Sequence, residues 1–418
     1  MDKAKPFIIS KQEVFRAYEL TKKNKSAAGI DDMSWKEFDK DLKKNLYKLW
    51  NRMSSGTYFP PLVKAIAIPK KTGGERILGI PTISDRIAQK VVKMNLESLI
   101  EPLFNPNSFG YRPYKSAHQA VEQAKNNCWT CNWGIDLDIK GFFDNLNHTL
   151  LMKMVKRHTD CAWVILYIER WLKTSMQMPD GSIVARVKGT PQGGVISPLL
   201  ANLYLHYAFD LWMTKEANDI KFERYADDII IHCRFLGQAK ELKEKLKKRF
   251  ELFGLELHPE KTKIFYCEDD KRNWGEGYAT SFDFLGFTFK KRTARGHQGK
   301  LFMGFQPGMS MAARRKISQT IRIWHLGRRG DLSIEEISRD YNAVIRGWVN
   351  YYGKFYKKAF SPIRCQFNVA LTRWAMRRFG ARYSKKRNQA SKFIYKLVQT
   401  QPELFAFWSE FYSGGNNG

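Results

Sequence analysis

The sequence predicts an α+β protein whose C-terminal third is helical. Residues 133–290 mix short runs of β-forming residues with long amphipathic patterns, which indicates a sheet covered by helices. From about residue 309 to 398 the pattern is helical, with breaks at 327–330 and 361–362. A chain of 418 residues is also too long for one ordinary core, so two or three domains are expected.

The remaining elements follow from the hydrophobic pattern and from turn residues. We expect helical structure over 11–55 with a break at 29–31, a strand pair over 62–80, a helix over 84–104, a helix over 237–253, an exposed loop over 268–280, and a basic linker or hairpin tip over 291–300.

Two adjacent acids stand between two β-forming runs. Tyr225-Ala226-Asp227-Asp228 lies between Phe222 and three isoleucines, which predicts a hairpin whose turn holds carboxylates at the end of a sheet. Charges beside such apolar strands are costly unless they are paired or bind a cation, and Mg²⁺ prefers carboxylate oxygens. A solvated Asp-Asp turn is the alternative.

A second acidic strand lies upstream. Alternation from Ile135 to Ile139 predicts a strand with Asp136 and Asp138 on one face, and the strand breaks at Gly141. A nucleotidyl transfer site needs two metal ions about 3.5–4 Å apart, so acids from this strand and from the hairpin turn could form one cage. We choose Asp138 as the ligand because it directly precedes the break.

A glycine-rich segment forms a third element. Gly193 and Gly194 predict a turn in which the backbone can approach a ligand closely, and Gln192 carries an amide that can contact a base or a sugar. Ser197 is expected to cap a helix that has Pro198 at its first position.

The charge of the chain points to nucleic acid. Its formal net charge is +30, and residues 291–418 hold 25 Lys and Arg against 6 Asp and Glu. Clustered cations with few acids nearby are costly unless phosphates neutralise them. The six cysteines form no disulfide framework, and no apolar run reaches the roughly 18 residues that a membrane span needs.

Nine sequence blocks, taken together, resemble group II intron reverse transcriptases, also called maturases. The resemblance runs from about residue 24 to 407. Its blocks, in order, are AGIDDMSWKEF (28–38), IPKKTGGERILGIPTISDRIAQ (68–89), SFGYRPYKSAHQA (108–120), DLDIKGFFDNLNH (136–148), GTPQGGVISPLLANLYL (189–205), RYADDIII (224–231), GLELHPEKTKI (254–264), FDFLGF (282–287) and IRGWVNYYGKF (345–355). The family usually has Gly where Asp32 stands and Gly-Arg where Tyr114-Lys115 stand, which affects a loop and one RNA contact.

The resemblance implies a right-hand polymerase with an antiparallel palm sheet, packed helices and an α-helical thumb called domain X. The expected domains are an N-terminal extension and fingers (1–130), a palm with part of the fingers (131–293), the thumb (300–380) and a basic nucleic-acid-binding segment (381–418). No paired histidine and cysteine block follows residue 400, so we expect no endonuclease domain.

The resemblance also implies roles for the acids and their neighbours. Asp138, Asp227 and Asp228 match the catalytic acids, with the backbone carbonyl of Ile139 as a further metal ligand, Asp228 nearer the primer terminus, and two Mg²⁺ ions, or Mn²⁺ in their place. Lys261 is the expected general acid for the pyrophosphate leaving group, and Lys263 remains its rival.

The expected nucleotide-binding residues are Lys70, Arg76, Phe143, Gln192 and Gly193, with Phe143 blocking a ribose 2′-OH by its bulk. Core packing is the alternative for Phe143. The sequence Phe284-Leu285-Gly286 matches the primer grip. The expected RNA and DNA contacts are Arg112, Lys115, Arg314, Arg315, Arg346, Tyr351, Arg377, Arg378, Lys385, Lys386 and Arg387.

The expected function is RNA-directed DNA synthesis together with assistance in splicing and retrohoming of an intron. The expected partners are intron RNA, an RNA template with a DNA or RNA primer, a DNA target and dNTPs, with the protein acting as a monomer or dimer on RNA in the cytoplasm, away from membranes. The alternatives are a reverse transcriptase of another lineage (retron, diversity-generating or phage-defence) and a purely RNA-binding maturase. All three acids are retained, which disfavours the last of these.

Overall fold

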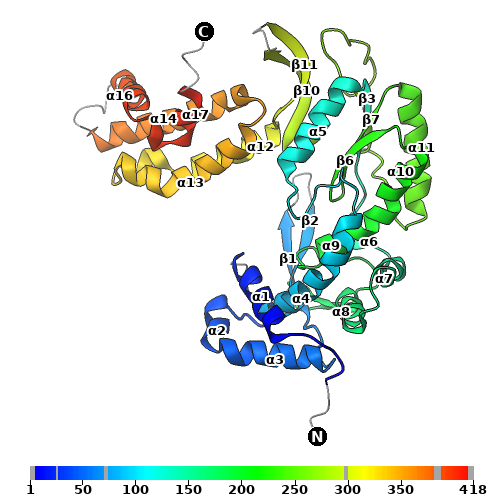
Figure 1. Ribbon diagram of the computed structural model, residues 1–418. Helices are drawn as coiled ribbons and strands as arrows, with labels where there is room; N and C mark the ends of the chain where they lie inside the picture. Colours follow the sequence, from blue (N-terminus) through cyan, green and yellow to red (C-terminus); the bar gives the residue numbers. More distant parts are fainter. Residues whose placement is uncertain (1–4, 25–26, 70–73, 296–299, 381–386, 413–418) are drawn as a thin grey trace. The chain divides into compact units, whose positions relative to one another are not determined.

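The computed structural model describes residues 5–24, 27–69, 74–295, 300–380 and 387–412. The chain divides into two compact units (Figure 1). The first comprises Met1–Ala120, Ile135–Ile231 and Leu236–Lys263, and the second comprises Val121–Gly134, His232–Phe235 and Ile264–Gly418.

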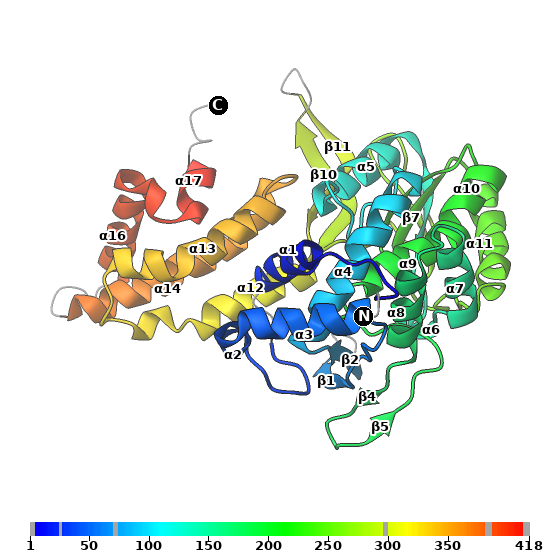
Figure 2. The same cartoon turned by 60° about the horizontal axis from the view of Figure 1, so that its bottom comes forward.

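The first unit is organised around α4 (Ile83–Ile100), which is buried along most of its length because apolar residues occupy several of its faces. The side chain of Thr82 caps its N-terminus. Helices α1, α3 and α8 pack against α4 (Figures 1 and 2). The other helices of this unit are α1 (Lys11–Lys22), α2 (Trp35–Lys40), α3 (Leu42–Ser54), α6 (Phe142–Asn145), α7 (His148–Lys156), α8 (Ala162–Lys173), α9 (Ser197–Leu205), α10 (Leu211–Glu216) and α11 (Leu236–Glu251).

One sheet of the first unit has the strand order β2-β1-β4-β5. Strand β1 (Val63–Pro69) pairs antiparallel with β2 (Glu75–Ile80), which confirms the strand pair predicted over 62–80. Strand β4 (Met176–Gln177) adds to β1 in parallel and continues into β5 (Ile183–Val184), an addition that the sequence did not predict.

The acidic strands belong to a sheet of order β6-β7-β3-β8. Its strands are β6 (Lys221–Tyr225), β7 (Asp228–Cys233), β3 (Trp133–Leu137) and β8 (Lys263–Tyr266). The predicted hairpin is confirmed as β6 and β7. The predicted strand through Ile139 ends at Leu137, so Asp138 lies just beyond the strand rather than inside it.

The predicted cap of α9 is wrong. Ile196 occupies the N-cap, and Ser197 is the first helical residue. The Ser197 hydroxyl accepts a hydrogen bond from Thr190 Oγ1 at 2.7 Å, so it is used by the preceding loop. Pro198 lies in the first turn, as predicted, and it is the one residue of α9 that is not buried.

The second unit combines a small sheet with a helical domain. The sheet has the order β11-β10-β9. Of the two alternatives predicted for 291–300, a basic linker or a hairpin tip, the structure supports the hairpin, because the segment extends the antiparallel strands β10 and β11, with 296–299 outside the described residues. The elements are α5 (Ala117–Thr130), most of which belongs to this unit, β9 (Ser281–Phe284), β10 (Phe287–Arg295), β11 (Leu301–Met309), α12 (Met311–Ile323), α13 (Ile334–Tyr352), α14 (Ser361–Arg378), α16 (Arg387–Thr400) and α17 (Ala406–Tyr412).

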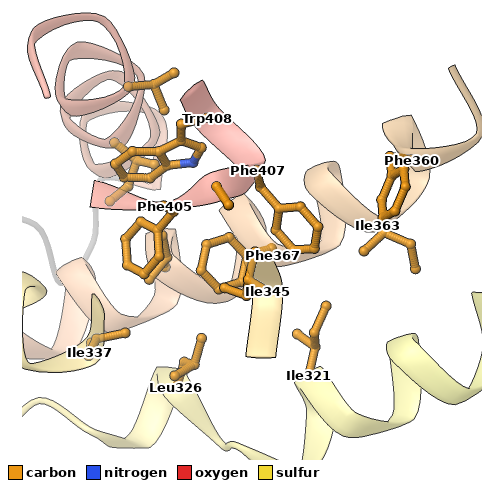
Figure 3. Close-up of a cluster of buried hydrophobic side chains, with 14 of the residues drawn as sticks. Ile321, Leu326, Ile337, Ile345, Phe360, Ile363, Phe367, Phe405, Phe407 and Trp408 are labelled. Atoms are coloured by element: carbon orange, nitrogen blue, oxygen red, sulfur yellow. The ribbon is translucent and has the colours of Figure 1, made fainter. Parts of the chain in front are cut away.

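An aromatic core joins the helices of the second unit. Figure 3 shows Phe367 of α14 directed toward Phe405 and Phe407, with ring centroids 5.0 and 5.5 Å apart. Trp408 packs on Phe405 at 4.8 Å. These contacts hold α17, which ends at Tyr412, against α14. Within the described residues, no helix combines the length and apolar character needed to span a membrane.

Candidate active site

The turn between β6 and β7 carries the first acid. Ala226 adopts a left-handed backbone with φ of 57°, and Asp227 follows it directly. Gly110 lies against this turn: a Cβ at that position would stand 2.3 Å from Ala226 N. The glycine in the 108–120 block is therefore needed for the close approach of its segment to the turn that carries Asp227.

The second acid, Asp138, is held in place by hydrogen bonds to its backbone carbonyl. Asp138 O accepts hydrogen bonds from His258 N at 2.8 Å and from Thr262 Oγ1 at 3.2 Å. Lys140 N also bonds to Glu256 O at 2.8 Å. The 254–264 block thus fixes the residue that follows β3, a role that the sequence did not predict for it.

The two acids affect each other electrostatically. Burial raises the pKa of Asp227, and the nearby Asp138 carboxylate raises it further. Lys261 Nζ lies 3.8 Å from Asp138 Oδ2, with both side chains about half exposed. Of the two rival lysines, Lys261 is the one with this ion pair.

Both acids line one open cavity of about 1210 Å³. The lining also includes predicted nucleotide-binding and general-acid residues, namely Arg76, Phe143, Gln192, Lys261 and Lys263. The described lining does not include Asp228, which begins β7. The structure therefore brings Asp138 and Asp227 together on one surface.

The predicted nucleotide-binding residues meet on one side of this cavity. Arg76 Nε donates a hydrogen bond to Gln192 Oε1, and Gln192 Nε2 donates to Asp144 Oδ2 at 3.4 Å. Gly193 has φ of 121°, and a Cβ there would stand 2.4 Å from Gly79 O, so this glycine lets the loop lie on β2. Lys70 lies outside the described residues.

Phe143 lies in the wall of the cavity. Its side chain is 9% exposed, whereas Phe142, next to it, is 2% exposed. The two rings meet edge to face at 5.3 Å. Phe143 O accepts a hydrogen bond from Thr190 N at 2.7 Å, which ties α6 to the glycine-rich loop. Both the predicted contact with a sugar and core packing are compatible with this position.

The predicted primer grip is the turn between β9 and β10 in the second unit. Leu285 and Gly286 have φ of 51° and 82°, and Gly286 O accepts from Ser310 N at 3.0 Å. Tyr351 Oη donates to Leu285 O at 2.9 Å. Tyr351 thus supports the turn, and its predicted contact with RNA stays a prediction.

Arg112 also differs from its prediction. Its guanidinium bonds to Asn105 O and Ser108 O, forms an ion pair with Glu101 at 2.8 Å, and is only 7% exposed. These contacts give Arg112 a structural role. Lys115 Nζ donates to Pro106 O at 2.9 Å.

Most of the predicted cations of the second unit face outward. Arg314 is half-buried, and Lys385 and Lys386 lie outside the described residues. The exposed ones are Arg315, Arg346, Arg377, Arg378 and Arg387. Among the aromatic residues that alternate with them, Trp374 is buried and Trp324 stacks on Trp348 at 5.4 Å, so these rings serve the protein's own packing.

The sequence did not predict the buried polar residues that bond to the glycine-rich loop. Gln89 Oε1 accepts from Val195 N at 2.7 Å, and Gln89 Nε2 donates to Asp85 Oδ2 at 2.9 Å. Asp85 also accepts from Tyr58 and Trp171. The available signal was the spacing of Asp85 and Gln89 at i and i+4, which lie on one face of the helix.

The carboxylates of this cavity suit a divalent ion only when substrate phosphates supply further ligands. Among the described residues, no three His, Cys, Asp or Glu side chains gather closely enough to hold a metal. Mg²⁺ keeps several waters and is usually held by one or two carboxylates plus substrate phosphates. Asp138 and Asp227 supply such a pair. Burial raises the pKa of Asp227 and the Asp138 carboxylate raises it further, so a bound cation would stabilise the ionised form of Asp227.

Comparison with known proteins places this site in a family. The model for "Reverse transcriptase (RNA-dependent DNA polymerase)" matches residues 68–289, and that for "Group II intron, maturase-specific domain" matches residues 314–393. The group II intron-encoded protein LtrA of Lactococcus lactis subsp. cremoris is 28% identical over 83% of this chain and 69% of its own length. Protein YkfC of Escherichia coli is 29% identical over 66% of this chain and 79% of its own length.

Among solved structures, a telomerase from Candida albicans matches 89% of this chain and 70% of its own chain with a TM-score of 0.46 and 12% identity. The reverse transcriptase model covers more than half of the chain and identifies it as an RNA-directed DNA polymerase, a class whose members generally use divalent metal ions. The chain belongs to the group II intron reverse transcriptases, with the polymerase domain followed by the helical maturase domain.

Proposed function

We propose that Asp138 and Asp227 hold the divalent ions with which this reverse transcriptase extends a DNA strand, and that Asp228 lies nearer the primer terminus. The observation that carries the proposal is the shared cavity of the two acids, Arg76, Gln192 and Lys261. A carboxylate pair, cations for a triphosphate and an amide for the nucleotide suit dNTP binding on a template.

The ions would be two Mg²⁺, with Mn²⁺ as a substitute, held by Asp138, Asp227 and the carbonyl of Ile139. When bound, such ions neutralise charge on the attacking and leaving oxygens of a nucleotidyl transfer.

The protein's own residues position the nucleotide and move one proton. Arg76 binds the triphosphate, Gln192 and Gly193 contact the nucleotide, and Lys70 adds a cation. The ring of Phe143 lies against the sugar and excludes a 2′-OH by size. Lys261 donates a proton from Nζ to the pyrophosphate oxygen as that group leaves, which its place beside Asp138 supports.

The second unit binds intron RNA and assists splicing and retrohoming. Exposed arginines on its helices support this assignment, since phosphates would neutralise them. On this reading the domains are fingers (1–130), palm (131–293), thumb (300–380) and a basic segment (381–418), and a DNA target is a further partner.

A metal-dependent melting experiment tests the site without relying on activity. Mg²⁺ together with a dNTP should raise the Tm of the wild-type protein, because a ligand that binds only the folded state stabilises it. The Asp138→Asn and Asp227→Asn proteins should lose both this shift and primer extension on an RNA template.

The Asp269→Asn protein, changed at an acid paired with Arg272 in the second unit, is the control and should keep both. Extension within about tenfold of wild type in both active-site variants would overturn the proposed metal site.

A further inference from the structure

A buried ion pair lies directly beneath the catalytic turn. Arg224 Nε donates to Asp210 Oδ1 at 2.9 Å, and Arg224 Nη2 donates to Asp210 Oδ2 at 2.6 Å. Both side chains are 0% exposed. Two parallel hydrogen bonds fix the plane of the guanidinium as well as its position.

The remaining guanidinium nitrogen reaches the turn itself. Arg224 Nη1 donates to Ala226 O at 3.0 Å and to Asn202 Oδ1 at 2.9 Å. Ala226 O belongs to the peptide group that joins Ala226 to Asp227. Arg224 therefore holds the peptide bond that sets the direction of the Asp227 backbone, next to a residue whose left-handed φ is unfavourable for alanine.

The same network reaches the segment behind the turn. Asn202 Nδ2 donates to Gly110 O at 2.7 Å, and Gly110 is the residue that lies against Ala226 N. The backbone of Arg224 is also bonded on both sides, from Arg224 N to Asn107 O at 2.9 Å and from Phe109 N to Arg224 O at 2.7 Å. The turn thus has a rigid support built from three separate stretches of chain.

Asp210 is presented to Arg224 by an unusual helix. Residues His206–Asp210 form a π-helix between α9 and α10, with Asp210 as its last residue. Such insertions are rare and often occur at functional sites. Asn202 of α9 and Asp210 at the end of the π-helix both bond to the same guanidinium.

Stability alone does not account for this arrangement. Burying two charges costs desolvation, and well-packed apolar residues of similar volume are often at least as stabilising as a buried ion pair. A benefit that an apolar pair cannot provide is directional: three hydrogen bonds to Asp210 and Asn202 fix the guanidinium, and a fourth holds the Ala226 carbonyl.

We infer that Arg224, locked by Asp210 and Asn202, is a positioning residue that fixes the Ala226–Asp227 peptide and thereby aims the Asp227 carboxylate at its metal ion. This inference rests on the proposed role of Asp227 as a metal ligand. Arg224 does not touch substrate, so its loss should lower kcat and weaken use of Mg²⁺ while leaving the KM for dNTP near the wild-type value.

The decisive variant replaces the pair by apolar residues, Arg224→Met with Asp210→Leu, which removes both charges together and leaves neither unpaired. We expect a folded protein with a Tm somewhat below wild type, because Ala226 O and Asn202 Oδ1 lose their donor. Its kcat should be lowered about 10–100-fold, as for residues that orient metal ligands, and it should need a higher Mg²⁺ concentration for half-maximal activity. The same exchange at Arg272 and Asp269, an ion pair of the second unit, should change neither quantity.

Arg224→Lys provides the second measurement, because a lysine keeps the charge beside Asp210 but cannot form the forked set of bonds. It should show the same lowered kcat and raised Mg²⁺ requirement. It decides the question if the double variant does not fold. A wild-type kcat and Mg²⁺ requirement in a folded variant would overturn the inference. Full activity of Asp227→Asn would instead overturn the proposed metal site, so the two failures are distinguishable.

Discussion

Arg76 and Gln192 are 116 residues apart in the chain, and the Arg76 guanidinium donates a hydrogen bond to the Gln192 amide oxygen. The first residue comes from a β-hairpin and the second from the glycine-rich loop. Their contact joins the two segments that the sequence separately predicted to bind a nucleotide.

This contact predicts coupled effects on nucleotide binding. Arg76→Ala and Gln192→Ala should each raise the KM for dNTP by about tenfold, the value expected from losing one hydrogen bond to a charged group. The double variant should be less impaired than the sum of the two, by about 1 kcal/mol, because either change already breaks the contact.

Steady-state extension with varied dNTP on a fixed RNA template measures these values. Lys64→Ala is the control, since Lys64 lies on the neighbouring strand and pairs with Asp32 rather than with the loop. Strict additivity would mean that Arg76 and Gln192 act on the nucleotide independently.

The buried Asp85 predicts a change of stability with pH. Burial raises the pKa of Asp85, and the bonds from Trp171, Tyr58 and Gln89 only partly offset this. A carboxyl group whose pKa is raised on folding stabilises the protein fully below its ordinary value of 3.8, and this stabilisation is lost as the pH rises through the folded pKa.

Asp85→Asn removes the titration and one acceptor oxygen. The variant should be less stable than wild type at pH 5 by about 1–3 kcal/mol, the cost of leaving buried donors unpaired. This deficit should narrow toward pH 8, because only the wild-type protein loses stability over that interval. Thermal melting at both pH values measures the two gaps.

Asp39→Asn is the matched control, because the pKa of Asp39 is lowered on folding whereas that of Asp85 is raised. Burial alone would raise the pKa of Asp39, but the hydrogen bonds from Lys22 and Tyr18 outweigh it and lower the pKa. Its stabilisation is present above the ordinary value of 3.8, so its deficit should stay constant between pH 5 and pH 8. A deficit for Asp85→Asn that also stays constant would contradict the predicted titration.

The core of the site could be predicted from sequence because it depends on local patterns. Alternation indicated β3, although the strand ends at Leu137 rather than at Ile139, and the two-residue turn after Tyr225 indicated the hairpin. Both acids therefore fall at strand ends, and strands of one sheet bring their ends together.

The supporting residues could not be predicted in the same way. Arg112 and Arg224 look like any other cations in the sequence, and their burial depends on partners supplied by the fold, such as Glu101 and Asp210. The Gln89 contact with Val195 spans 106 residues. Ser197 fits the preferred residues of a helix cap, but tertiary contact with Thr190 takes its hydroxyl.

The position of Phe143 in the cavity wall leads to a prediction about the selection of deoxyribonucleotides over ribonucleotides. Phe143→Ala should raise ribonucleotide incorporation relative to deoxyribonucleotide by roughly tenfold or more, because the barrier would be steric. Competing single-nucleotide extensions on one template measure the ratio. Phe142→Ala is the control, since that ring is buried and should cost stability rather than selectivity. An unchanged ratio in the Phe143 variant would assign its ring to the core.

The exposed arginines of the second unit predict how RNA affinity depends on salt. Arg315, Arg377 and Arg387 are exposed on three different helices of this unit. If they contact phosphates of the intron RNA, each contact releases counterions when it forms, and the logarithm of affinity should fall linearly with the logarithm of salt concentration.

Changing all three to Gln should reduce the steepness of that dependence by up to about 2–3, at roughly 0.7–0.9 per lost contact. It should lower splicing assistance more than extension on a short preformed primer–template, because the first unit supplies the catalytic residues. Filter binding over a salt series and a splicing assay with the same RNA measure both effects.

The control removes the same charge from the first unit. Lys245, Lys247 and Lys248 are exposed on α11, and changing them to Gln alters the net charge equally. A general electrostatic attraction would make the two triple variants alike, with equal salt dependence and equal splicing. A specific RNA surface on the second unit requires that only the arginine variant lose slope and splicing assistance, and an arginine variant identical to wild type in both assays would remove the basis for placing the intron RNA there.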